Sequence, residues 1–143
     1  MGDAGAVVGV VSLALQVLQG LSQYYSQFKA FDDTIAQTTH RVERLRGILV
    51  AVDGPVRKFE VDNSPISEQV RLAITSCEVG LGKLQDIVEK CSKTQVGGKF
   101  PSPLQTVKNR VLFPFRKSTL DDLGTYLGRV QANLGTILQA LQL

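Results

Sequence analysis

The chain has 143 residues, of which 43% are hydrophobic and 20% are charged, and its formal net charge is +3. These totals are typical of one folded domain and exclude an intrinsically disordered chain. With two cysteines and one histidine, the composition also excludes a disulfide-rich scaffold and the usual structural zinc sites.

The first predicted helix spans Ala4–Phe28, with Asp3 as its N-cap, and contains no charged residue. On a helical wheel, one side is a stripe of small or uncharged polar residues: Gly5, Gly9, Ser12, Gln16, Gln19, Gln23 and Gln27, with Gly20 at its edge. The opposite side is a wide apolar arc made of Val7, Val8, Val10, Val11, Leu13, Ala14, Leu15, Val17, Leu18, Leu21 and Phe28.

Two interpretations of this helix stay open. It is a core helix whose glutamines touch water, or a helix that leaves the bundle and enters a bilayer. Its first eighteen residues, Ala4–Leu21, would span about 27 Å, close to the ~30 Å hydrocarbon core. Residues Val7, Val8, Val10, Val11, Leu13, Leu15, Val17, Leu18 and Leu21 would then insert, and the glycines of Gly5-x-x-x-Gly9 would allow close helix packing.

The second and third predicted helices follow. The second begins near Asp32 or Asp33, with its apolar stripe at Ile35, Thr39, Val42, Leu45, Leu49 and Val52, and Asp53-Gly54-Pro55 is expected to interrupt it. Ser64-Pro65 is a start signal for the third helix, which runs to Cys91. Cys77 and Cys91 would lie about 21 Å apart along this helix, too far for a disulfide, so we expect two reduced core thiols.

The last part of the chain is predicted to form a loop at Lys93–Pro103, a short helix at Leu104–Leu112 and a long final helix opened by a Ser118-x-x-Asp121 capping box. In the final helix, leucine-type residues recur every three or four positions: Leu120, Leu123, Leu127, Val130, Leu134, Ile137 and Leu141. The fold class is therefore all-α, a single-domain bundle of four long helices plus one or two short ones. Because the pattern still runs at Leu143, we expect the parent protein to continue beyond it.

The positive charge is concentrated in one segment. Between Lys90 and Lys117 there are seven basic residues and no acidic ones: Lys90, Lys93, Lys99, Lys108, Arg110, Arg116 and Lys117. Aromatic and aliphatic residues are interleaved with them. The segment is a solvated basic loop, a surface for anionic lipids through Lys108, Arg110, Arg116 and Lys117, or a weaker candidate for nucleic-acid binding, for which no motif is present.

Catalytic patterns are missing from the sequence. His40 stands alone on a helix, and there is no phosphate-binding loop and no nucleophile elbow. The acid pairs Asp32-Asp33 and Asp121-Asp122 stand at helix starts, where the helix dipole favours them. We therefore expect a non-enzymatic domain without a metal or cofactor.

Four stretches resemble the HeLo-like (HELL) domains of filamentous fungi: the glycine-dotted helix Ala4–Leu18, the segment Arg41–Leu49, the segment from Leu72 through Ser76-Cys77-Glu78 to Val88, and Phe113-Pro114-Phe115 leading into the final helix. The family often has Trp-Pro-Phe where this chain has Phe113-Pro114-Phe115. The resemblance covers nearly the whole chain and depends on the order and spacing of these stretches.

The resemblance implies a cell-death domain at the N-terminus of a fungal NOD-like receptor or of an amyloid-signalling executioner, similar to the necroptosis executioner of animals. It implies a cytoplasmic domain that clusters into a homo-oligomer, moves to the plasma membrane, binds anionic lipids and permeabilises the bilayer in innate immunity or heterokaryon incompatibility. The alternative is a non-lytic interaction or autoinhibitory module of a signalling NTPase receptor.

Overall fold

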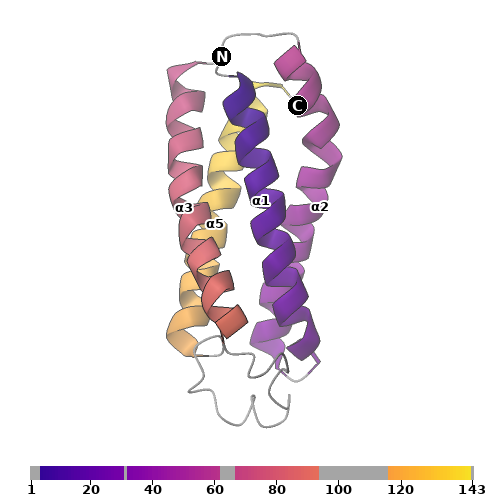
Figure 1. Ribbon diagram of the computed structural model, residues 1–143, viewed down its shortest axis with the longest axis vertical. Coiled ribbons are helices and arrows are strands. Elements are labelled where there is room, and N and C mark those ends of the chain that lie inside the picture. The colour runs from indigo at the N-terminus through magenta and orange to yellow at the C-terminus, as the bar shows by residue number, and fades with distance from the viewer. Residues whose placement is uncertain (1–3, 31, 62–66, 94–115, 143) are drawn as a thin grey trace.

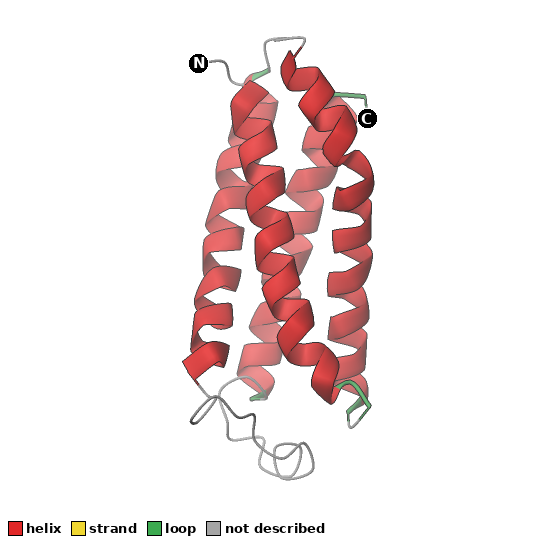
Figure 2. Ribbon diagram, turned by 45° about the vertical axis from the view of Figure 1, so that its right-hand side comes forward, coloured by secondary structure: helices red, strands yellow, loops and turns green. Residues whose placement is uncertain are grey.

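Four long helices run side by side along one axis in the computed structural model, which describes residues 4–30, 32–61, 67–93 and 116–142. They are α1 (Ala4–Tyr25), α2 (Asp33–Val61), α3 (Glu68–Lys93) and α5 (Lys117–Ala140), and a 3-10 turn, η1 (Ser26–Phe28), follows α1. Helices α1 and α3 run in one direction and α2 and α5 in the other (Figure 1). The described part of the chain contains no strand, as Figure 2 shows. The all-α helical bundle predicted from the sequence is confirmed.

The four helices pair unequally. Helix α1 packs most extensively against α2 and α3 against α5; α1 also contacts α3, whereas α2 and α5 pack least. Every α5 position of the predicted leucine-type pattern faces the core, with Leu120, Leu123, Leu127, Val130, Leu134 and Ile137 buried and Leu141 half-buried. Burying one such side chain stabilises the fold by about 1.5–3 kcal/mol, so the repeat accounts for much of the packing of α5.

The predicted interruption of the second helix is wrong, because α2 continues through Pro55 to Val61. A proline inside a helix loses one backbone hydrogen bond and crowds the preceding residue. Here the preceding residue is Gly54, which has no Cβ to clash, and Val56 is fully buried. The ion pair between Arg57 Nε and Asp53 Oδ2, at 3.1 Å, also spans the proline. Burial and local geometry thus outweigh the helix-breaking tendency of Pro55.

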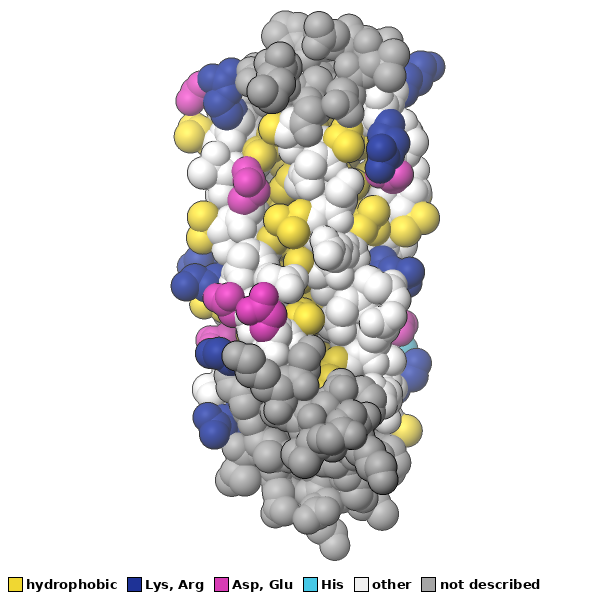
Figure 3. Space-filling model, viewed as in Figure 1, with side chains coloured by type: hydrophobic (Ala, Val, Ile, Leu, Met, Phe, Trp, Pro, Cys, Tyr) yellow, Lys and Arg dark blue, Asp and Glu magenta, His cyan; other side chains and the backbone are white. Residues whose placement is uncertain are grey.

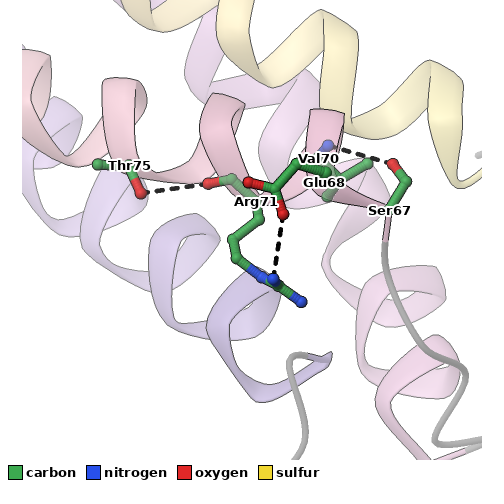
Figure 4. Close-up of polar contacts among 5 residues, drawn as sticks. All are labelled: Ser67, Glu68, Val70, Arg71 and Thr75. Carbon is green, nitrogen blue, oxygen red and sulfur yellow. Dashed lines mark hydrogen bonds and ion pairs between the residues drawn. The ribbon is translucent and has the colours of Figure 1, made fainter.

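Two of the predicted helix starts differ from the structure. Helix α3 begins at Glu68, after an N-cap at Ser67, so Ser64-Pro65 does not start it. The Ser67 hydroxyl accepts a hydrogen bond from the Val70 N–H at 3.2 Å (Figure 4). The same view shows the Arg71–Glu68 ion pair at 3.2 Å and the Thr75 hydroxyl donating to the Arg71 carbonyl. A serine near the predicted start does cap the helix, three residues later than expected.

Helix α5 begins at Lys117, with the extended Arg116 at the N-cap position and no side-chain cap. The capping box predicted at Ser118 is therefore wrong. The Leu120 N–H donates to the Arg116 carbonyl at 3.0 Å, which places Ser118 inside the first turn. The start of α2 is as predicted, since Asp32 Oδ1 accepts hydrogen bonds from the N–H groups of Thr34 and Ile35 at 2.9 and 3.2 Å. Asp3, the predicted loop at Lys93–Pro103 and the predicted short helix at Leu104–Leu112 lie outside the described ranges, apart from Lys93, which ends α3.

Candidate membrane-active helix

The apolar arc of α1 is the face that packs into the bundle. Its buried members are Val7, Val10, Val11, Ala14, Val17, Leu18 and Leu21, each at most 2% exposed. Val8, Leu13 and Leu15 are half-buried and pack against the edge of the core. All nine residues predicted to insert into a bilayer are therefore docked inside or against the bundle. Any insertion requires α1 to leave its neighbours first.

The small and polar stripe of α1 is the face toward solvent. The exposed members are Gly9, Ser12, Gln16 and Gln23, and Gln19 is half-buried. The exposure of Gly5 is not described. Figure 3 looks onto this face: the surface over the middle of α1 shows no acidic or basic side chain, while such side chains flank it. A surface helix normally places charges on its solvent side. Helix α1 has neither a charged core face nor a charged solvent face.

The glycine that α3 approaches most closely is Gly20 rather than Gly9. A Cβ added at Gly9 would meet nothing within 4 Å, whereas a Cβ at Gly20 would lie 3.0 Å from Val88 Cγ1 of α3. The Gly5-x-x-x-Gly9 motif therefore has no visible packing role at Gly9 in this bundle. The sequence placed Gly20 only at the edge of the stripe, and that edge position is the signal that it faces a neighbour.

One polar atom of α1 is buried without a partner. The Gln19 Oε1 has no hydrogen bond, although it is inaccessible to solvent. An unsatisfied buried acceptor costs about 1–3 kcal/mol. Gln19 therefore weakens the docking of α1 against the bundle.

The C-terminal end of α1 is held by aromatic side chains. The rings of Tyr24 and Tyr25 meet edge to face at 5.2 Å, and the Tyr24 ring lies 5.5 Å from that of Phe28. The Cys91 thiol of α3 donates to the Tyr25 hydroxyl, with a sulfur–oxygen distance of 3.7 Å. This end of the helix is thus held by ring contacts and a thiol–hydroxyl hydrogen bond in addition to buried aliphatic side chains.

Both cysteines are free and buried, as the sequence predicted. Burial raises the pKa of the Cys77 thiol to about 12, and the nearby Glu78 carboxylate adds to the shift. Burial also raises the pKa of Cys91 to about 11, partly offset by its hydrogen bond with Tyr25. The two groups are therefore neutral thiols at physiological pH and are poor nucleophiles.

The segment Ala6–Phe28 is long and apolar enough to cross a membrane, with a mean hydropathy of 1.5. In its most apolar stretch, 39% of the residues are buried in the bundle. The buried core helix of a soluble protein meets the same criterion. Length and apolarity alone therefore do not separate the two interpretations of α1. The uncharged solvent face is the feature that a simple core helix does not need.

The described basic residues of the Lys90–Lys117 segment lie at one end of the bundle. Arg116 and Lys117 are exposed at the start of α5, and Lys90 is exposed near the end of α3. These helix ends lie beside the end of α1 (Figure 1). Lys29, which the sequence reasoning did not single out, is exposed there too. Lys108 and Arg110, predicted to share this role, lie outside the described residues.

Among the described residues there is no group of three or more His, Cys, Asp or Glu side chains that could hold a metal ion. His40 is exposed on α2. Asp33, Asp121 and Asp122 are also exposed near the basic end of the bundle, so its described surface has charges of both signs. The described geometry therefore combines a surface with charges of both signs and an uncharged helix whose apolar face is docked in the bundle.

A curated protein similar to this chain is the azaphilone pigments biosynthesis cluster protein L of Monascus ruber. The two are 32% identical over 142 residues, which cover 96% of this chain and 29% of that protein. The chain thus spans less than a third of its relative. No family model matches the chain, and no solved structure matches it. The comparison establishes similarity to a segment of a longer fungal protein.

Proposed function

We propose that the chain is a HeLo-like effector domain of fungal cell death that permeabilises membranes when clustering releases α1 from the bundle. The observation that carries the proposal is the complete absence of charge on both faces of α1. A charged residue near the bilayer centre costs roughly 2.5–3.5 kcal/mol on insertion scales, and α1 incurs none of that cost. In a helix that always stayed docked, lysine or glutamate at exposed positions such as Gln16 would be tolerated.

Release of α1 exchanges the apolar core of the bundle for the apolar interior of a bilayer. The valines and leucines of α1 leave the bundle core and regain their burial among lipid chains, so the hydrophobic contribution is largely conserved. The glutamines of the polar stripe oppose insertion of a single helix. Several copies of α1 would satisfy Gln16, Gln19 and Gln23 by hydrogen bonds across helices or by facing a water-filled lumen. Activation therefore depends on assembly of a homo-oligomer.

The basic end of the bundle would dock first on an anionic leaflet. Each lysine or arginine near such a surface contributes about 1 kcal/mol, and Arg116, Lys117, Lys108 and Arg110 are the proposed contacts. This end lies beside the end of α1, whereas Ala4 is one helix length away, about 33 Å. Helix α1 would therefore turn about its C-terminal end, bringing its N-terminal half to the membrane. The domain would be cytoplasmic at rest and would reach the plasma membrane on activation.

The test is dye release from anionic liposomes by the Gln16→Lys variant. Gln16 is exposed, so the substitution should change the free energy of unfolding by less than about 0.5 kcal/mol. It should nevertheless reduce leakage strongly, by about a hundredfold if the cost of one inserted charge enters the rate. Gln131→Lys, at an exposed position of α5, is the matched control and should leak like the unmodified protein. Equal leakage by all three proteins would remove α1 from the mechanism.

A second candidate function is a non-lytic interaction module of a larger signalling receptor. It is favoured by exposed apolar residues on the outer faces of two other helices. Leu72 and Val79 of α3 are 62% and 59% exposed and stand one heptad apart, and Ile48 and Val50 of α2 are 44% and 58% exposed. This function predicts that the expressed domain is harmless to cells and that Leu72→Asp abolishes partner binding. Membrane puncta and cell death on expression would argue against it.

A further inference from the structure

A polar cleft lies between α2 and α5, the two neighbouring helices that pack least against each other. Its volume is about 540 Å³, within the roughly 300–1,000 Å³ of small-molecule sites. Thr34, Thr38 and Arg41 of α2 and Asp121, Gly124 and Thr125 of α5 line it. The cleft is separate from the exposed face of α1, and the membrane mechanism above does not use it.

Glycines on α5 make room for the arginine of this cleft. A Cβ added at Gly124 would lie 3.5 Å from Arg41 Nη1, and one at Gly128 would lie 3.4 Å from Arg41 Nη2. The Arg41 guanidinium therefore reaches across one turn of α5, beside two positions that have no side chain. The two glycines thus leave room for this planar, two-pronged donor group next to α5.

Opposite charges share the cleft without neutralising each other. Arg41 and Asp121 both line it, yet no ion pair joins these two side chains in the described part of the chain. A simple anion would be attracted by Arg41 and repelled by Asp121. A ligand with one negative and one positive group would satisfy both side chains at once.

We propose that this cleft binds the zwitterionic headgroup of a phospholipid, phosphoethanolamine or phosphocholine. The Arg41 guanidinium would bind the phosphate through paired N–H donors, a geometry that suits arginine. The Thr34 and Thr38 hydroxyls would add donors on the α2 side. The Asp121 carboxylate would bind the ammonium group on the α5 side.

The cleft lies at the same end of the bundle as the basic residues. Asp121 stands five residues after Arg116, little more than one turn along α5. A headgroup bound there would hold the basic end against a membrane surface. The biological role of the site thus rests on the proposed membrane function, whereas its occupancy by a soluble headgroup does not.

The experiment titrates the isotopically labelled intact chain with glycerophosphocholine, glycerophosphoethanolamine and inorganic phosphate, and follows backbone amide NMR shifts. We expect saturable shifts on both walls of the cleft with the two headgroups and weaker binding of phosphate. Arg41→Gln and Asp121→Asn should each weaken headgroup binding about fivefold, the upper range for one exposed ion pair. The matched controls Arg129→Gln and Asp122→Asn, also exposed on α5, should change it less than twofold.

Three results would overturn the proposal: no saturable shift with either headgroup, equal effects of the control variants, or inorganic phosphate that binds as tightly as the two headgroups, which would indicate a plain anion site. A second arm uses flotation with phosphatidylglycerol vesicles with and without phosphatidylethanolamine. Stronger flotation of the chain with the vesicles that contain phosphatidylethanolamine, lost in Asp121→Asn, supports a membrane lipid as the source of the headgroup. Equal flotation with both kinds of vesicle excludes that source. The leakage test is independent of the headgroup titration. Loss of dye release in Gln16→Lys would support the membrane function of α1 whatever the titration shows.

Discussion

Helices α1 and α3 lie side by side and bury similar apolar faces, but their solvent faces differ. Exposed α3 positions include Glu68, Arg71, Glu78, Lys83 and Glu89, whereas exposed α1 positions include Gly9, Ser12, Gln16 and Gln23. Both helices fulfil the packing needs of the same bundle. Packing therefore does not require the absence of charge on α1, and this difference is the basis of the proposed membrane function.

The largest expected effects come from the buried faces, where the two helices should behave alike. Leu21→Ala in α1 and Leu84→Ala in α3 each truncate a side chain at most 1% exposed. Each should lower the free energy of unfolding by about 2–5 kcal/mol, the usual range for a buried leucine. Urea titration followed by circular dichroism measures both. A loss below 1 kcal/mol for Leu21→Ala alone would mean that α1 is not docked in solution.

A somewhat smaller effect on stability is expected from raising the pH, and it concerns the two thiols of α3, which have no counterpart in α1. The pKa values of Cys77 and Cys91 are raised to about 12 and about 11 in the folded chain. The unfolded chain therefore loses these protons first, and stability falls as the pH rises from about 9 toward 12. At pH 10 the loss should be about 1 kcal/mol for each thiol.

The measurement for the thiols is a series of urea titrations from pH 7 to pH 10. A Cys77→Ala/Cys91→Ala variant is the control and should lack most of the pH dependence. Stability that is equally pH-dependent in the variant would place the titrating groups elsewhere.

The smallest expected change in stability concerns a single polar atom of α1. Gln19→Leu removes the unpartnered buried Oε1 of α1 and should stabilise the bundle by about 1 kcal/mol. Gln85→Leu, at a half-buried position of α3, is the matched control and should change stability by less than 0.5 kcal/mol. The more tightly docked Gln19→Leu variant should also leak dye more slowly. Destabilisation by Gln19→Leu would show that the glutamine is satisfied in solution.

The sequence predicted the four helices and nearly all core positions, because periodic leucine and valine patterns depend only on helical geometry. It failed at Pro55, where the absence of a Cβ on Gly54 and the burial of Val56 permit a continuous helix. It also misplaced the start of α3, because Ser64 and Ser67 both satisfy the local capping rule, and the start of α5, where Arg116 precedes the helix and no side chain caps it. The wheel position of Gly20 was its only signal, and neither its neighbour Val88 nor the Arg41 cleft could be found, because both depend on which helices become neighbours.

The central claim, that α1 must leave the bundle to act, can be tested by locking it in place. A Cβ at Gly20 would lie 3.9 Å from the Cβ of Val88, within the 3.5–4.5 Å of natural disulfides. The Gly20→Cys/Val88→Cys variant should therefore form a disulfide between α1 and α3. Dye release from anionic liposomes should be absent from the oxidised protein and restored when the same sample is reduced. Full leakage from the oxidised, cross-linked protein would contradict the account.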